Sequence, residues 1–169
     1  FRTTDNGTTW TPSNSGMSTW YISALATIGG DLYAATGGAT FRSTKGGESW
    51  IKGGTGLPTS WYVRSLVSIG TELFAGVNAR GVYHSTASGA TWTATNAGLA
   101  DTQVTRIMVI GSTLFAGTQS GLYRSTDIAT IRGESFDLLV VAGAPAAKWV
   151  ADRDPAADRS HCSRTGPSS

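Results

Sequence analysis

The chain has little charge, almost no cysteine and no long apolar run. Charged residues make up 14% of its 169 positions, and the net charge of +2 comes with no basic run, which argues against nucleic-acid binding. A single cysteine, Cys162, excludes an internal disulfide framework and a multi-cysteine zinc site. No apolar stretch approaches the ~20 residues of a membrane-spanning helix. Glycine (22 residues) and tryptophan (6) are abundant, which favours short strands and tight turns.

A tryptophan-terminated motif repeats along the chain. FRTTDNGTTW forms residues 1–10, without an initiator methionine or a signal-type apolar run. FRSTKGGESW and YHSTASGATW follow at residues 41–50 and 83–92, so that the three tryptophans are 40 and 42 residues apart. The segments 20–36, 61–77 and 102–118 also align without a gap. A fixed period of this length predicts a repeat architecture.

Each repeat has the pattern of four short strands. Apolar residues recur at every second position in segments such as 22–28, as in half-buried strands, and IGG, IGT and IGS form the turns that follow. Strand 2, a glycine-containing loop, strand 3 and the motif turn come next, and a short strand 4 opens at the tryptophan. Four antiparallel strands in about 40 residues is the size of a β-propeller blade, so we expect an all-β fold.

The residues Thr3 to Trp10 resemble an Asp-box, the S/T-x-D-x-G-x-T-W signature of BNR-type β-propellers. Such repeats occur in sialidases, in sortilin-like receptors and in the xyloglucan-degrading enzymes of glycoside hydrolase family 74, to which GLP at 56–58 is most similar. The resemblance covers residues 1–127, with blade boundaries near Trp10, Trp50 and Trp92. It implies the fold and leaves the function open, because Asp-box proteins include enzymes, receptors and assembly factors. Related proteins are often secreted or periplasmic, and the localisation of this soluble chain is open.

The Asp-box residues have a mechanical explanation. A short aspartate accepts backbone N–H bonds inside a turn, a serine or threonine hydroxyl adds another, and glycine tolerates a positive φ. The tryptophan is expected to pack between neighbouring sheets. We therefore assign structural roles to Asp5, Gly7, Trp10, Trp50, Trp92 and Asp127, with a calcium role for Asp5 as the alternative. Lys45 and Ala87 replace the aspartate in the middle repeats, whose turns then depend on Gly47, Gly89 and the hydroxyls.

The strand count amounts to three blades. The chain starts with the end of strand 3 and strand 4 of one blade, continues with two complete blades, and adds strands 1–3 of another that end near Arg124. Propellers close with typically 4–8 blades, and an open fan leaves edges that invite pairing. We therefore expect a homodimer of six blades with C2 symmetry, in which each chain donates its N-terminal strand 4 to the last blade of the other.

Residues 128–169 depart from the repeat. Alanine, arginine, aspartate and proline dominate there, as in an out-of-frame translation of a G+C-rich gene or across a cloning junction. One interpretation is a poorly packed appendage. In the other, SFDLLVVAG forms a strand that substitutes for the missing strand 4, and APAAKWVADRD forms a short helix.

Three functions follow from these resemblances. The chain is also similar to small calcium-dependent acyl-homoserine lactonases from environmental DNA (metagenomes), which implies a hydrolase that opens a lactone with Ca²⁺ and quenches quorum sensing. The alternative is a noncatalytic propeller that binds a glycan or a protein. A glycoside hydrolase is third, because that chemistry needs two carboxylates across a cleft. Asp31 and Glu72 lie in strand 1–2 turns, on the wrong face by family analogy.

The expected site lies on the face formed by the loops from strand 4 to strand 1. Asp101 is the only carboxylate of the repeat region in such a loop. Calcium accepts carboxylate and amide oxygens and polarises a carbonyl or a bound water. We therefore expect Asp101, Asn78 and Gln119 to hold Ca²⁺, with Asp101 as the catalytic candidate. Asp101→Asn is then expected to lose activity with little loss of fold, and Asp5→Asn the reverse.

Aromatic residues gather on the same face. Trp20, Tyr21, Trp61 and Tyr62 occupy equivalent loops, and Arg80 lies in a loop of the same side. Such platforms suit a carbohydrate, or the amide and acyl chain of a lactone; the alternative is that they cap the blades. His84 occupies the repeat position of Arg42 and Arg124 and is expected on a strand-3 surface or between blades, with a general base that faces the channel as the other option. We expect no nucleic-acid or membrane partner.

Overall fold

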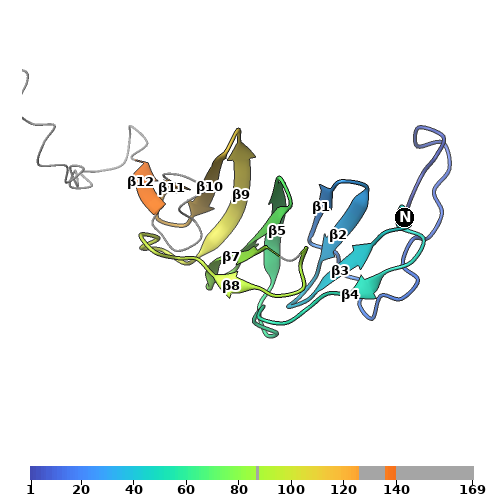
Figure 1. Ribbon diagram of the computed structural model, residues 1–169, viewed down its shortest axis with the longest axis horizontal. Coiled ribbons are helices and arrows are strands. Elements are labelled where there is room, and N and C mark those ends of the chain that lie inside the picture. The colour runs from blue at the N-terminus through green and yellow to red at the C-terminus, as the bar shows by residue number, and fades with distance from the viewer. Residues whose placement is uncertain (87, 126–135, 140–169) are drawn as a thin grey trace, which may run out of the picture.

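The computed structural model describes residues 1–86 and 88–125, together with the backbone of residues 136–139. The described residues form strands and turns and contain no helix, and hence none that could cross a membrane. Three antiparallel four-stranded sheets stand side by side (Figure 1). We call them blade 1 (β1–β4), blade 2 (β5–β8) and blade 3 (β9–β12). The all-β propeller-blade architecture predicted from the repeat is confirmed.

The strands of each blade follow one another in sequence order across the sheet. Blade 1 consists of β1 (Ala24–Ile28), β2 (Asp31–Ala35), β3 (Thr40–Ser43) and β4 (Ile51–Lys52). Blade 2 consists of β5 (Val63–Ile69), β6 (Glu72–Val77), β7 (Gly81–Ser85) and β8 (Thr93–Ala94). Blade 3 consists of β9 (Val104–Ile110), β10 (Thr113–Thr118), β11 (Leu122–Ser125) and β12 (Phe136–Leu139).

Tight turns set the register of the first two strands in every blade. Ile28 pairs with Asp31 and Ile69 with Glu72, which leaves two residues in each turn. The first turn residue is Gly29 in blade 1, with a φ of 58°, and the matching glycines of the other blades have φ values of 58° and 60°. A two-residue hairpin of this kind needs positive φ, which glycine adopts without strain.

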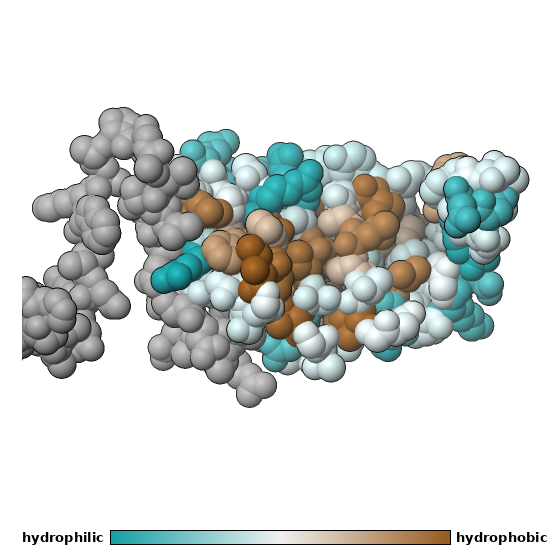
Figure 2. Space-filling model, turned by 90° about the horizontal axis from the view of Figure 1, so that it is seen from above, coloured by the Kyte–Doolittle hydropathy of each residue, from teal (hydrophilic) through white to brown (hydrophobic). Residues whose placement is uncertain are grey.

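Apolar residues between the blades form the core. The interface of blades 1 and 2 buries Tyr33 against Val63 and Leu66, and the interface of blades 2 and 3 buries Phe74 against Ile107. Strand β5 contacts both β1 and β9 along the inner edge of the fan. Apolar residues run across the middle of the molecule when it is seen from above, with hydrophilic ones on either side (Figure 2).

Hydroxyl groups and glycines hold the motif turns, as predicted. The Ser43 hydroxyl accepts a hydrogen bond from the Gly47 amide at 3.0 Å, and the Ser85 hydroxyl accepts one from the Gly89 amide at 3.0 Å. Gly47 and Gly89 have φ values of 88° and 82°. These bonds explain how the middle turns form without the aspartate. Asp127 and Ala87 lie outside the described residues.

The first motif turn adds an aspartate to the same design. Asp5 accepts hydrogen bonds from the Thr9 amide (2.9 Å), the Thr9 hydroxyl (2.6 Å) and the Thr3 hydroxyl (2.7 Å). The Thr3 hydroxyl in turn accepts one from the amide of Gly7, whose φ is 90°. The bonds from Thr9 and Thr3 lower the pKa of Asp5 to about 2. Asp5 therefore acts within its own turn.

Two expectations for the tryptophans need correction. Trp50 and Trp92 are buried as expected, but Trp10 is 58% exposed because no described sheet packs over it. Strand 4 opens at Ile51 and Thr93, one residue later than predicted. The reason is that the Trp50 amide donates to Ser15 O, and the Trp92 amide to Thr55 O. Their backbones thus join the segment that enters from the preceding repeat.

The ends of the repeat region carry the strands on which the expected strand exchange depends. Arg2 and Thr11 form an antiparallel bridge, which is the predicted remnant of strands 3 and 4. The fourth position of blade 3 is occupied by β12 of the same chain, paired with β11. The interpretation of SFDLLVVAG as a substitute strand is therefore confirmed for residues 136–139, and a second chain is not required to complete this sheet. The remaining tail lies outside the described residues.

Polar pairs link the strand 1–2 turns to strand 3. Asp31 accepts a hydrogen bond from Arg42 Nε at 2.8 Å, and Glu72 Oε2 lies 3.1 Å from His84 Nε2. His84 is buried, and its ring stacks on Phe74 with centroids 4.6 Å apart. Because Phe74 belongs to the core between blades 2 and 3, His84 is an inter-blade residue, the first of the two roles expected for it.

Candidate functional site

A cleft of about 960 Å³ opens along the inner edge of the fan, where β1, β5 and β9 begin. Residues of all three blades line it: Thr19, Tyr21, Ser23, Gly37, Tyr62, Val63, Arg64, Thr105 and Arg106. Thr19, Tyr21 and Tyr62 in this lining belong to loops that lead from strand 4 of one repeat to strand 1 of the next. The cleft therefore lies on the face on which the sequence predicted ligand binding.

Two tyrosines form the aromatic part of the cleft. The rings of Tyr21 and Tyr62 meet edge to face, with centroids 5.9 Å apart and planes at 74°. Both side chains are more than half exposed. Gly37 forms a bridge with Tyr62, and a side chain there would press on the tyrosine ring at 3.3 Å. The tyrosine pair thus presents polar hydroxyls and apolar ring faces from a supported position.

Two arginines supply the charge of the cleft. Arg64 and Arg106 are both exposed, and Arg106 Nη1 donates a hydrogen bond to Arg64 O at 3.1 Å, which ties β9 to β5. No carboxylate is among the described residues that line the cleft. A concave surface with charge of one sign attracts ligands of the opposite sign. Its chemistry suits an anionic group, because the guanidinium fork matches carboxylate geometry.

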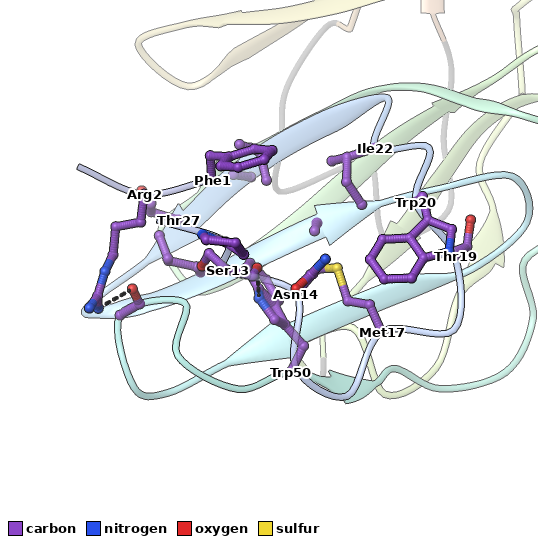
Figure 3. Close-up of a pocket in the computed structure, with 16 residues that line it drawn as sticks. Phe1, Arg2, Ser13, Asn14, Met17, Thr19, Trp20, Ile22, Thr27 and Trp50 are labelled. Atoms are coloured by element: carbon purple, nitrogen blue, oxygen red, sulfur yellow. Dashed lines mark hydrogen bonds between the residues drawn. The ribbon is translucent and has the colours of Figure 1, made fainter. Parts of the chain in front are cut away.

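The other predicted contact residues lie apart from the tyrosine pair. Trp20 is 80% exposed and lines a different pocket, on blade 1 (Figure 3). Trp61 packs against the core of blades 1 and 2, and the guanidinium of Arg80 lies 4.9 Å from its ring centroid. Cation–π contact of this kind holds Arg80 over the tryptophan. The structure therefore brings together Tyr21 and Tyr62 and does not place Trp20, Trp61 or Arg80 in the lining.

Asp101 ties two loops of blade 3 together. Its Oδ1 accepts a hydrogen bond from the Gln103 amide at 2.8 Å. Its Oδ2 accepts bonds from the Ser120 amide (2.8 Å) and the Ser120 hydroxyl (2.7 Å). The bonds from Gln103 and Ser120 lower the pKa of Asp101 to about 2. A carboxylate this acidic is a weak proton acceptor at neutral pH.

The loops of Asn78 and Gln119 lie next to the loop of Asp101. The Gly81 amide donates to Thr102 O at 3.0 Å, and Ser120 binds Asp101 directly. Both oxygens of Asp101 accept hydrogen bonds in these loops, and calcium binding by Asp101, Asn78 and Gln119 stays a prediction. In residues 1–86 and 88–125, no three His, Cys, Asp or Glu side chains gather where they could share a metal ion.

Sequence reasoning missed Arg64 and Arg106. In the aligned repeats Arg64 shares its position with Ser23 and Thr105, and Arg106 shares its position with Ala24 and Ser65. Two arginines on innermost strands, where other repeats have small residues, were the available signal. That they share one cleft depends on how β5 and β9 pack.

Residues 1–99 match the family model of the DUF6242 beta propeller domain. No curated protein matches the chain significantly. Among solved structures, YCF48 bound to D1 peptide has a TM-score of 0.58 and 17% identity, over 69% of this chain and 39% of its own.

Two enzymes of glycoside hydrolase family 74 are similar in structure. The xyloglucanase from Xanthomonas campestris has a TM-score of 0.54 and 20% identity, over 73% of this chain and 24% of its own. The GH74 enzyme of Niastella koreensis has a TM-score of 0.52 and 24% identity, over 69% and 22%. The chain thus spans well under half the length of these neighbours, and at such identities the likeness shows the fold.

Proposed function

The chain belongs to the family of the DUF6242 beta propeller domain, and on that premise we propose that it is a noncatalytic binding propeller whose ligand is an acidic peptide segment. This peptide ligand binds in the cleft at the inner edge of the fan. The observation that carries this proposal is the pairing of two exposed arginines with an edge-to-face tyrosine pair, in a cleft whose described lining has no carboxylate.

Each part of the cleft has a role in this function. Arg64 and Arg106 attract glutamate and aspartate side chains and hold them through charge-assisted hydrogen bonds. Tyr21 and Tyr62 cover the apolar stems of those side chains and offer hydroxyls to the peptide backbone. A volume of about 960 Å³ accommodates several residues of an extended chain. One structural neighbour, YCF48, is seen with a peptide bound, which agrees with this class of ligand.

Fluorescence anisotropy with a labelled Glu/Asp-rich peptide tests the proposal. The same peptide with Gln and Asn in place of the acids is the matched probe, and we expect it to bind much more weakly. Arg64→Ala and Arg106→Ala should each weaken binding roughly fivefold, since an exposed charge pair is worth up to about 1 kcal/mol. Lys52→Ala, on the outer strand β4, is the control and should bind normally.

Added salt should weaken the complex, because exposed charges are screened. Equal binding of the two peptides would refute the proposal. So would a loss of affinity in Lys52→Ala as large as that in Arg64→Ala, because the attraction would then be a property of the whole surface.

Calcium-dependent opening of an acyl-homoserine lactone stays a prediction. The bonds of Asp101 favour its role as a loop clamp, and the sequence resemblance is the support for the reaction. Hydrolysis of a homoserine-lactone panel, with calcium and with a chelator, tests it directly. Turnover that requires calcium and disappears in Asp101→Asn would favour the hydrolase over the binding propeller. Carbohydrate binding is tested by xyloglucan in the same anisotropy assay as a competitor.

A further inference from the structure

The two ends of the fan expose positions that are buried between the blades. Leu25, Leu66 and Ile107 occupy one position of the aligned repeat. Leu66 and Ile107 are each 5% exposed, because the preceding blade covers them, whereas Leu25 on blade 1 is 66% exposed. The side of blade 1 that faces away from blade 2 is therefore a blade interface that no blade of the described residues covers.

The pocket on this side of blade 1 has the composition of an inter-blade core. It measures about 650 Å³ and is drawn in Figure 3. Seven lining residues are the repeat equivalents of Leu57, Trp61, Val63, Leu66, Leu73, Ala75 and Trp92, which surround Tyr33 between blades 1 and 2. We call these seven the socket: Met17, Trp20, Ile22, Leu25, Leu32, Ala34 and Trp50. Phe1 also lines the pocket, but no described strand supplies the socket with an aromatic side chain in the way that β2 supplies Tyr33 to blade 2.

The opposite end of the fan carries the complementary group. Phe115 on β10 is the repeat equivalent of Tyr33 and Phe74, which fill the two internal interfaces. Beside it, Met108 and Ile110 on β9 are 53% and 60% exposed. Their equivalents in the other blades pack against the next blade. We call Met108, Ile110 and Phe115 the knob.

The N-terminal segment already lies where a preceding blade belongs. The Trp50 amide binds Ser15 O at 2.8 Å, just as the Trp92 amide binds Thr55 O at 2.9 Å at the next boundary. Trp50 Nε1 also donates to Ser13 O at 2.9 Å. The bridge between Arg2 and Thr11 matches the pairing of Arg42 with Ile51. The segment thus holds the two outer-strand positions of a blade next to blade 1.

We propose that a second copy of this chain fills the socket: the knob of each copy packs into the socket of the other, which closes a ring of six blades. The same repeat forms both surfaces, so the interface continues the packing seen twice within the chain. Knob and socket lie at opposite ends of the three described blades, so each copy presents both surfaces at once. Two identical knob-and-socket contacts, related by a two-fold axis, close the ring, so the interface between the two copies is isologous as a whole.

The fourth strand of blade 3 has two candidates in this assembly. β12 pairs with β11 in the single chain, and Thr11 holds the same position beside Arg2. The segment after Thr11 is hydrogen-bonded to blade 1 next to the socket, so it is in place when blade 3 of the second copy arrives. In the ring Thr11 therefore replaces β12 beside the partner's β11.

Sedimentation velocity at micromolar concentration tests the assembly. We expect a species of twice the 17.5 kDa of one chain. Leu25→Glu and Met108→Glu should each yield single chains, because a charge enters the socket or the knob at both contacts. Both side chains are more than half exposed, so the variants should retain the β-strand circular dichroism of the parent. Ile51→Glu, 75% exposed on the outer strand β4, is the matched control and should remain a dimer.

Mixing the two variants distinguishes head-to-tail packing from face-to-face packing. A pair made of one Leu25→Glu chain and one Met108→Glu chain keeps one intact knob-and-socket contact, so the mixture should regain part of the dimer. A parent chain that sediments at 17.5 kDa would overturn the proposal. A dimer that Met108→Glu leaves intact would also overturn it, because the socket would then pair with a different surface.

Discussion

Leu25 and Leu66 are the same residue at the same repeat position, and they allow a sharp test of where the fold gets its stability. Leu66 is 5% exposed and packs with Tyr33 and Val63 between blades 1 and 2. Burial of a leucine side chain contributes about 1.5–3 kcal/mol, and truncation leaves a cavity that adds to the loss. We expect Leu66→Ala to lower the free energy of unfolding by about 2–4 kcal/mol.

Leu25→Ala should cost far less in the single chain. Leu25 is 66% exposed, so about a third of its surface is protected and the expected loss is roughly 0.5–1 kcal/mol. Urea unfolding of dilute protein, followed by tryptophan fluorescence, measures both values from the midpoint and slope. Equal losses would refute the reasoning, since they would mean that blade 1 is already covered in the single chain. As the protein concentration rises, Leu25→Ala should become more costly if the ring forms, because assembly stabilises the folded chain.

The remaining predictions concern the turns and the tryptophans. The Asp5 carboxyl should titrate in NMR with a midpoint at about 2, and Asp5→Asn should weaken its turn. Because the pKa of Asp5 is lower in the folded chain, its contribution to folding stability is complete above about pH 4 and is lost as the pH falls to about 2. A midpoint near 3.8 would contradict the observed hydrogen bonds. Asp101→Ala should cost about 1 kcal/mol and increase hydrogen exchange at the Ser120 amide, because the amide then keeps only its longer bond to the Thr118 hydroxyl, at 3.2 Å. Unchanged exchange would exclude the clamp. Trp92→Ala should lower the free energy of unfolding by about 3–5 kcal/mol and Trp10→Ala by under about 1 kcal/mol, because Trp92 is 4% exposed and Trp10 is 58% exposed. Similar losses for the two variants would show that Trp10 is covered.

Much of the local structure was predictable from the repeat. The motif turns depend on hydrogen bonds between residues at most four positions apart, such as those from Thr9 to Asp5, and such contacts can be read from the sequence. The hairpin glycines are equally local, because positive φ is a property of the turn. The aromatic face was predicted for the same reason, since Tyr21 and Tyr62 occupy the same loop of two repeats.

The site was only partly predictable because its geometry joins distant residues. In the sequence Asp101 is a loop carboxylate, which is a residue type that binds metals. Its hydrogen bond from Ser120, 19 residues away, makes it a link between two loops instead. Arg64 and Arg106 lie on different blades and meet through a hydrogen bond from a side chain to a backbone oxygen. No periodicity indicates that contact, which follows from the approach of β9 to β5.

By itself the sequence determined the repeat, its four-stranded unit and the turns that close it, because these depend on propensity, alternation and contacts within a few residues. The tertiary structure decided which of the equivalent side chains are buried. Leu25 and Leu66 have the same local sequence pattern and differ in exposure by more than half of their surface, because only one of them has a blade packed against it. Burial depends on neighbours that the fold brings together, and the sequence of one repeat does not specify those neighbours.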